Sequence, residues 1–267
     1  FFAGLTLALP GVMGEFFNGI RSLLTDNLSW AFMISTNVFV LLAIALIFSP
    51  LGKVRLGGTE ASPDFSYLGW FAMLFAAGMG VGLMFYCVSE PLTYFDDLLS
   101  GTAGPLGQQM ASEESAKALS MATSIFHWGL HPWATYAIMA LALALFAFNK
   151  GLPLTVRSIF YPVLGERIWG WPGHIIDVMA VFATLFGLAT SLGLGASQAS
   201  AGLHYLFGVP NSNTTMVLLV LGITAVTLIS VVAGVEKGVR RISQVNMSLA
   251  FALMLFVIVV GPTALIL

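Results

Sequence analysis

The sequence predicts an all-α polytopic membrane protein, and three observations support that fold class. Hydrophobic residues make up 58% of the chain, whereas charged residues make up only 8%. A soluble domain carries about 25% charged residues, so this composition favours an integral membrane protein. The apolar residues also fall in runs close to the ~20 residues that a membrane-spanning helix needs. Helices are expected in these runs because a backbone in lipid must satisfy its hydrogen bonds internally.

Charge and cysteine content exclude several other classes. The formal net charge of −2 gives no indication of a nucleic-acid partner. The single cysteine, Cys87, excludes an internal disulfide and a cysteine-based metal cluster. Because Phe1 and Leu267 both lie inside apolar runs, we expect a fragment cut at both ends.

The predicted elements alternate between apolar spans and polar connectors. Phe1–Leu9 resembles the end of a first span, and Pro10–Asn27 is expected to lie at the membrane surface as an amphipathic helix. Further spans are expected at Leu28–Phe48, Phe65–Tyr94, Ser115–Phe148, Pro172–Phe207, Thr214–Val235 and Val245–Leu267. The connectors between them are Leu51–Ser66, Asp96–Glu114, Asn149–Trp171 and the short amphipathic Glu236–Gln244.

Basic residues are distributed asymmetrically over these connectors. The connectors on one side of the membrane contain eight basic residues, whereas those on the other side contain only Arg21 and Lys117, together with several acidic residues. The positive-inside rule therefore places the richly basic side in the cytoplasm. The basic residues on that side are Lys53, Arg55, Lys150, Arg157, Arg167, Lys237, Arg240 and Arg241.

Three glycines at alternate positions, Gly78, Gly80 and Gly82, interrupt an apolar span. Each glycine costs about 1 kcal/mol relative to alanine in a helix interior, so the helix is expected to loosen there. A loosened membrane helix exposes backbone carbonyls and amides, which form ion and substrate sites in transporters. The alternative is close helix packing, since small residues let two backbones approach each other.

Three aromatic residues gather in the next span. Trp128, Trp133 and Tyr136 cover an arc of about 140° at ~100° per residue, and Pro132 can bend that arc tighter. Electron-rich rings on one face suit a cation without hydrogen-bond donors, such as a quaternary ammonium. The alternative is an aromatic belt at the membrane interface.

Other polar residues within spans admit more than one interpretation. His127 and His131 have the i, i+4 spacing of two metal ligands, although packing or hydrogen bonding is favoured because no further ligand accompanies them. Thr184 can coordinate a hard cation through oxygen or join helices. Glu90 and Asp177 lie near the ends of spans, where structural pairing or capping competes with proton relay.

Several strings in the chain, taken together, resemble the betaine/choline/carnitine transporter (BCCT) family. The match runs in order along essentially the whole chain, and the string in the fourth span is highly specific. The matching strings lie within Phe65–Phe75, Ala77–Tyr86, Ser89–Pro91, His127–Ala134, Ser191–Gly195, Gly234–Gly238 and Gly261–Thr263.

The resemblance implies a twelve-span carrier whose leucine-transporter-type core contains two inverted five-span repeats. Residues 1–64 would hold the two preceding spans and their linkers, and residues 65–267 the first repeat, with the second repeat missing. The resemblance also implies a multi-pass protein of the bacterial plasma membrane that assembles as a homo-oligomer, a trimer by analogy with the family. Neither an enzymatic activity nor a cofactor is expected beyond a coupling ion.

The resemblance also assigns binding residues. Backbone carbonyls of Ala76 and Met79 would form one side of a sodium site. Thr184 matches the first of two threonines in a second sodium site, but Leu188 stands where the second threonine would be. Half of an aromatic cage and the unwound substrate-facing segment would comprise Trp128, Trp133, Tyr136, Gly78, Met79, Gly80 and Gly82.

The sequence therefore predicts a secondary transporter that imports a quaternary-ammonium compatible solute, most simply glycine betaine, together with sodium. Gly82 leaves room beside the substrate and adds no anion, which favours a zwitterion over choline. The alternatives are proton-coupled choline uptake and sodium-independent carnitine/betaine exchange. A more distant alternative is an intramembrane metal enzyme that uses His127 and His131.

Overall fold

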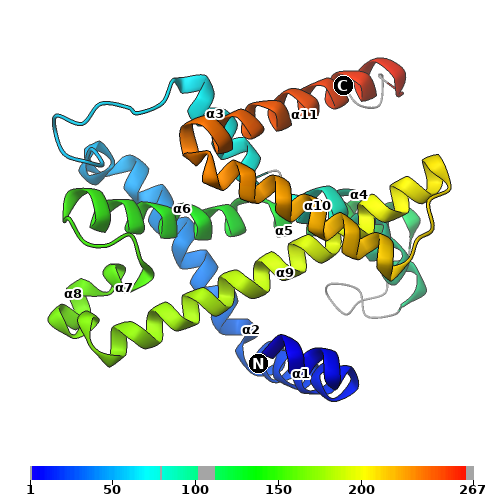
Figure 1. The fold of residues 1–267 in the computed structure, drawn as a ribbon, viewed down its shortest axis with the longest axis horizontal. Helices are drawn as coiled ribbons and strands as arrows, with labels where there is room; N and C mark the ends of the chain where they lie inside the picture. Colours follow the sequence, from blue (N-terminus) through cyan, green and yellow to red (C-terminus); the bar gives the residue numbers. More distant parts are fainter. Residues whose placement is uncertain (1, 79, 102–111, 263–267) are drawn as a thin grey trace. The chain divides into compact units, whose positions relative to one another are not determined.

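The computed structural model describes residues 2–78, 80–101 and 112–262, and every regular element within these ranges is helical (Figure 1). This confirms the predicted all-α class. The chain divides into two compact units. The first comprises Phe1–Thr59 and Ile125–Ile159, and the second comprises Glu60–Ser124 and Phe160–Leu267.

In the first unit, one long helix packs along a shorter one. The long helix is α2 (Pro10–Phe48), and its partner is α6 (Leu130–Ala144). Asn149, which follows α6 by five residues, accepts a hydrogen bond from the amide of Gly57 at 2.9 Å and donates to the carbonyl of Arg55 at 2.8 Å. The remaining elements are α1 (Phe2–Ala8), η1 (Pro50–Lys53), the end of α5 (Glu113–Trp128), η2 (Leu145–Asn149) and α7 (Val156–Ile159).

The prediction of a separate surface helix before the second span was wrong. Pro10–Asn27 and Leu28–Phe48 form one continuous helix of 39 residues. The polar residues at the predicted boundary do not break it, because their side chains bond back within the helix. Asn27 donates to the Leu23 carbonyl at 2.8 Å, and Trp30 donates to the Asn27 carbonyl at 3.0 Å. At 1.5 Å per residue, α2 is longer than the ~30 Å hydrocarbon core that it has to cross.

The second unit contains two packed groups of helices. Here α3 (Tyr67–Gly78) lies against α11 (Arg240–Val260), while α9 (Trp171–Phe207) contacts both α4 (Val81–Ser100) and α10 (Asn213–Val232). The other elements are most of α5 (Glu113–Trp128), α8 (Tyr161–Leu164), η3 (Gly165–Trp169) and η4 (Val235–Val239).

Local sequence signals explain the ends of the best-predicted spans. Pro172 occupies the first turn of α9, where its missing N–H has no helical partner to lose. At the other end of α9, Gly208 adopts a left-handed φ of +69°, and its N–H caps the His204 carbonyl at 2.9 Å. Ser212 caps α10 by accepting the amide of Thr215 at 3.3 Å. The predicted fifth and sixth spans are therefore confirmed to within three residues.

Two further boundaries differ from the prediction. The acidic pair Asp96 and Asp97 belongs to α4, which continues to Ser100, instead of beginning a loop. The basic segment Glu236–Gln244 is not a separate amphipathic helix, because α11 runs unbroken through Gln244 to Val260. Neither the step from Tyr94 to Asp97 nor the step from Gln244 to Val245 contains a glycine or proline that would end a helix.

Within the described ranges, five helical segments are long and apolar enough to cross a membrane, or six if α3 and α4 count as one bent span. The predicted partial first span corresponds to α1, which has 7 residues. These spans confirm a polytopic membrane protein. The five segments are Pro10–Phe48, Glu113–Asn149, Trp171–Phe207, Asn213–Val232 and Val235–Val260.

Candidate functional site

The glycine-bearing span is interrupted, as its sequence predicts. Helix α3 ends at Gly78, α4 begins at Val81, and the two helices are bent by 51°. Gly80 between them has an extended backbone, with φ −85° and ψ 176°. Met79, an expected carbonyl ligand and substrate contact, lies outside the described residues.

This interruption leaves backbone groups without helical partners. Ala76 lies in the last turn of α3, where the final carbonyls of a helix lack intrahelical donors. Gly82 lies in the first turn of α4, where the first amides likewise lack acceptors. The Gly80 carbonyl is already used, since it accepts the Met84 amide at 3.2 Å. Carbonyls that suit a cation and amides that suit a carboxylate thus lie on either side of the interruption.

Close packing holds this interruption against α9, but through a different glycine. An added Cβ at Gly80 would meet nothing within 4 Å, so packing does not explain that glycine. A Cβ at Gly195 would meet Val81 Cγ1 at 3.3 Å. One turn further along α9, Gln198 Nε2 donates to the Met84 carbonyl at 3.4 Å. The first turn of α4 is therefore fixed to α9.

The aromatic span is also interrupted, at a different residue from the Pro132 that the sequence had singled out. Helix α5 ends at Trp128 and α6 begins at Leu130, so the interruption is at Gly129. Pro132 is the third residue of α6, where a missing N–H costs no helical hydrogen bond. A Cβ at Gly129 would lie 2.6 Å from the Ile125 carbonyl oxygen, so this close approach requires glycine.

The carbonyl of Trp128, the last residue of α5, accepts a side-chain donor from α6 in place of a backbone amide. In a continuous helix, the amide at position 132 would bond to the carbonyl of Trp128. The indole N–H of Trp133 takes that place and donates to the Trp128 carbonyl at 2.9 Å. The same bond fixes the orientation of the Trp133 ring.

The structure brings two of the three predicted cage rings together. The Trp133 and Tyr136 ring centroids are 5.8 Å apart with an interplanar angle of 37°. Tyr136 is 69% exposed and Trp133 is 39% exposed, so both rings have free surface. The Trp128 ring lies 5.2 Å from the His127 ring, and Trp128 joins the pair through its backbone carbonyl.

His131 anchors the first turn of α6 to α2. Its Nε2 lies 3.3 Å from Asn37 Oδ1, and its ring packs 4.5 Å from the ring of Phe126. Among the described residues, no group of three His, Cys, Asp or Glu side chains is arranged to hold a metal ion. The role seen for His131 is the helix-joining one that was favoured from the sequence.

The remaining polar candidates also have hydrogen-bond partners. Thr184 donates to the carbonyl of Ala180 at 2.9 Å, which leaves its oxygen lone pairs available. It lies eleven residues before Gly195, or about 16 Å along α9. Glu90 is only 6% exposed and is hydrogen-bonded by Tyr94, so its described role is structural pairing.

The predicted site residues fall in both units. The three aromatic residues belong to the first unit, whereas Ala76, the glycines and Thr184 belong to the second. Sequence reasoning missed Gly129, Asn37 and Gln198. A glycine three residues before a proline, inside the most specific string, was the available signal for Gly129.

Residues 1–267 match the model of the betaine/carnitine/choline family transporter, BCCT. The chain belongs to the BCCT family. Among its relatives, the glycine betaine/proline/choline transporter of Vibrio parahaemolyticus is 57% identical over 100% of this chain and 50% of its own length. Glycine betaine transporter 1 of the same organism is 51% identical over 92% of this chain and 46% of its own length. Glycine betaine transporter OpuD of Bacillus subtilis is 44% identical, covering 92% and 47% respectively.

The BCCT chain spans about half the length of the curated relatives that it matches. Family membership makes it a transporter-family protein, not an enzyme, which removes the metal-enzyme alternative. It is a multi-pass protein of the cell membrane, as expected.

Proposed function

We propose that this BCCT chain is part of a secondary transporter that imports glycine betaine together with sodium. The observation that carries the proposal is the fixed aromatic pair at Gly129, where the Trp133 indole caps a backbone carbonyl beside Tyr136. A trimethylammonium group has no N–H to donate, so the faces of electron-rich rings are its natural partners. The names of the three relatives described above include glycine betaine and support the same substrate.

Trp128, Trp133 and Tyr136 are proposed to bind the ammonium head, with the Trp133–Tyr136 pair at the centre. The ring of Trp133 is held by its indole bond, so it does not have to be ordered when the substrate arrives. We further propose that these rings face the interruption between α3 and α4 in the assembled transporter.

The interruption between α3 and α4 is proposed to receive the carboxylate end. The first amides of α4 can donate to an anion, and Gly82 adds neither bulk nor a competing charge there. Gly78, Met79 and Gly80 are proposed as the other substrate contacts. A substrate with its own carboxylate uses these donors, which favours betaine over choline. Proline shares that carboxylate, and the name of one relative includes both proline and choline.

Sodium is proposed to bind the carbonyls of Ala76 and Met79. Ala76 lies in the last turn of α3, where unpaired carbonyls supply the oxygen ligands that a hard cation needs. A second site at Thr184 would be weak, because Leu188 one turn later offers no oxygen. Proton-coupled choline uptake and sodium-independent carnitine/betaine exchange are the competing mechanisms.

The family resemblance supplies the proposed architecture. Residues 65–267 would form the first inverted repeat of a leucine-transporter-type core, after two N-terminal spans within residues 1–64. A trimer is the proposed assembly.

Transport by the full-length protein in proteoliposomes tests the function. We expect an inward sodium gradient to drive accumulation of labelled glycine betaine, and an inward proton gradient alone to drive none. Trp133→Leu should weaken betaine binding more than tenfold, since a desolvated cation–π contact contributes about 2 kcal/mol. Accumulation driven by protons, or exchange without any gradient, would contradict the coupling. Unchanged betaine binding by Trp133→Leu would contradict the aromatic cage.

A further inference from the structure

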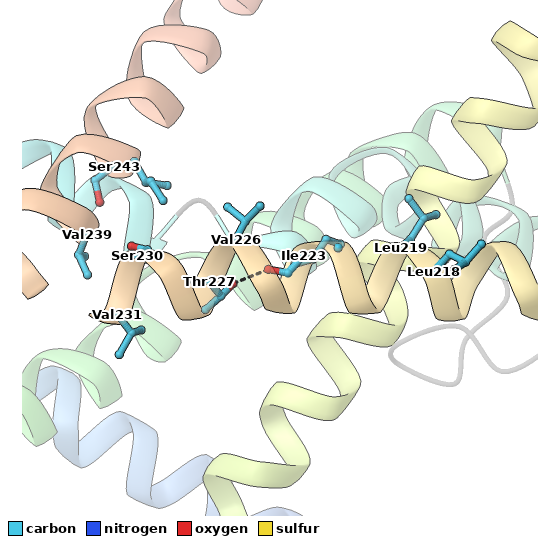
Figure 2. Close-up of a pocket in the computed structure, with 11 residues that line it drawn as sticks. Leu218, Leu219, Ile223, Val226, Thr227, Ser230, Val231, Val239 and Ser243 are labelled. Carbon is cyan, nitrogen blue, oxygen red and sulfur yellow. Dashed lines mark hydrogen bonds between the residues drawn. The ribbon is translucent and has the colours of Figure 1, made fainter. Parts of the chain in front are cut away.

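An apolar groove runs between α10 and the η4–α11 segment in the second unit (Figure 2). We call it the α10–α11 groove; its volume is about 630 Å³. Both flanking helices meet the criteria for membrane spans, so the groove lies at the depth of the lipid chains. Its lining residues are Leu218, Leu219, Gly222, Ile223, Val226, Thr227, Ser230, Val231, Val239, Ile242 and Ser243.

The groove adjoins a second hollow that is lined by two cationic side chains. This hollow, of about 300 Å³, shares Val226, Ser230 and Ile242 with the groove and is also lined by Lys237 and Arg241. The two basic residues are four positions apart, so they lie on the same helical face. The apolar groove and the hollow with the two positive charges therefore share one wall.

These two charges remain available to an external anion. The neighbouring acid, Glu236, is paired with Arg240, with Oε1 and Nη1 3.8 Å apart. Within the part of the chain that the structure describes, no ion pair joins Lys237 or Arg241 to a carboxylate, and both residues are exposed.

A tight turn fixes the shape of the groove. Gly234 has a left-handed φ of +84°, and a Cβ on Gly238 would collide with the Ser230 carbonyl. The buried side chains of Ser230 and Ser243 lie where α10 and α11 converge, and the two helices diverge beyond them (Figure 2). The turn thus fixes how the two helices converge, and the hollow lined by the two cations adjoins it.

We propose that the α10–α11 groove binds one anionic phospholipid, with an acyl chain along the groove and the phosphate at Lys237 and Arg241. Leu218 to Ser230 covers about 18 Å of helix, close to the ~15 Å depth of one bilayer leaflet. Basic residues at the end of an apolar channel between membrane helices attract anionic headgroups. This combination selects a charged lipid over a zwitterionic one and does not depend on the transported substrate.

Native mass spectrometry of the delipidated full chain tests the proposal, with phosphatidylglycerol and phosphatidylcholine of identical acyl chains as probes. Phosphatidylglycerol is expected to bind at least about tenfold more tightly. Lys237→Gln with Arg241→Gln should abolish that preference. The matched double change Lys150→Gln with Arg167→Gln removes equal charge elsewhere and should preserve it.

A second variant tests the acyl chain. Gly222 lines the groove, and a Cβ there meets nothing within 4 Å, so Gly222→Leu places an apolar side chain in the groove. It should weaken binding of both lipids, whereas Gly202→Leu, at an equally open position in α9, should not.

Photocrosslinking provides a readout that does not require any variant to fold. A diazirine-labelled phosphatidylglycerol should attach to peptides of α10 and α11. Three results would overturn the proposal: equal affinity for the two lipids, a preference that survives loss of both charges, and crosslinks confined to other helices. Protection of the groove by another protein segment or a second copy would also overturn it.

Discussion

Two membrane helices of this chain are interrupted, and they are interrupted in different ways. Between α3 and α4 the chain separates two helices with an extended Gly80, whose Cβ position is open. Between α5 and α6 a single residue, Gly129, brings the backbone so close to the Ile125 carbonyl that no side chain fits. The first interruption leaves backbone groups accessible, whereas the second brings two backbone segments into close contact. We call them the open and the compressed interruption, respectively.

The neighbours of the two interruptions differ accordingly. At the compressed interruption, the Trp133 indole donates to the carbonyl of Trp128. This bond positions an aromatic ring there in place of a free backbone group. At the open interruption, α9 fixes the start of α4 through Gly195 and Gln198. The carbonyls in the last turn of α3 have no donors within the helix. One interruption can therefore supply ion ligands, and the other supplies a rigid aromatic surface.

Adding one methyl group at each glycine should give the largest contrast. Gly129→Ala places a Cβ 2.6 Å from the Ile125 oxygen, and relieving that clash should cost about 2 kcal/mol or more. Gly80→Ala meets no atom within 4 Å and needs no unusual φ, so its cost should stay within about 0.5 kcal/mol. Thermal unfolding of both variants in one detergent measures the difference. Equal shifts in melting temperature would show that the two positions tolerate a Cβ equally well.

Replacing Trp133 should separate its capping role from its ring chemistry. Both Trp133→Phe and Trp133→Leu remove the donor to the Trp128 carbonyl, so both should lower stability by about 1 kcal/mol. Only Trp133→Leu removes the ring, so betaine affinity should fall further in that variant. Isothermal titration alongside thermal unfolding gives both quantities.

Trp30→Phe is the matched control, since the Trp30 indole donates to the Asn27 carbonyl within an unbroken helix. It should leave betaine affinity unchanged. If Trp133→Phe and Trp133→Leu lose the same affinity, the indole bond, not the π surface, determines binding.

These two interruptions also show which features of the helices could be predicted from the sequence. Three alternate glycines within a lipid-length run predict the first break, because each weakens the same stretch of helix. At the second, proline drew attention to position 132, although a proline in a first turn costs nothing and the break lies at Gly129. The continuity of α2 through Asn27 was missed because side-chain bonds to preceding carbonyls satisfy polar residues inside a helix.

Contacts between distant segments were less accessible to sequence reasoning than the helices. Nothing local connects His131 to Asn37, which lies 94 positions away, or Gln198 to Met84, which lies 114 away. The aromatic residues and the glycine stretch, by contrast, could be selected from residue chemistry alone. Their meeting in one binding site remains a prediction.

Sodium dependence tests the ligand role of the open interruption. With one carbonyl site at Ala76 and Met79, uptake by the full-length protein should rise with sodium at a Hill slope near one. Leu188→Thr adds an oxygen one turn after Thr184 and should raise the slope toward two. Phe186→Thr, about 160° around α9 from both Thr184 and Leu188, should not change it. A slope near two in the unmodified protein would mean that other residues build the second site.

The smallest expected effect concerns the hydrogen bond between His131, two residues after Gly129, and Asn37 of α2. Asn37 Nδ2 donates to the Met33 carbonyl at 2.7 Å, which turns Oδ1 toward His131. An amide oxygen only accepts, so His131 Nε2 must carry the proton of this 3.3 Å contact.

A double-mutant cycle with Asn37→Ala and His131→Ala should therefore give a coupling free energy of about 0.5–1.5 kcal/mol, measured by thermal unfolding. Asn27→Ala replaces an asparagine of the same helix whose amide bonds to Leu23, so its effect should add to that of His131→Ala. Additivity of the Asn37 pair as well would show that packing between α2 and α6, without this hydrogen bond, holds the aromatic turn in place.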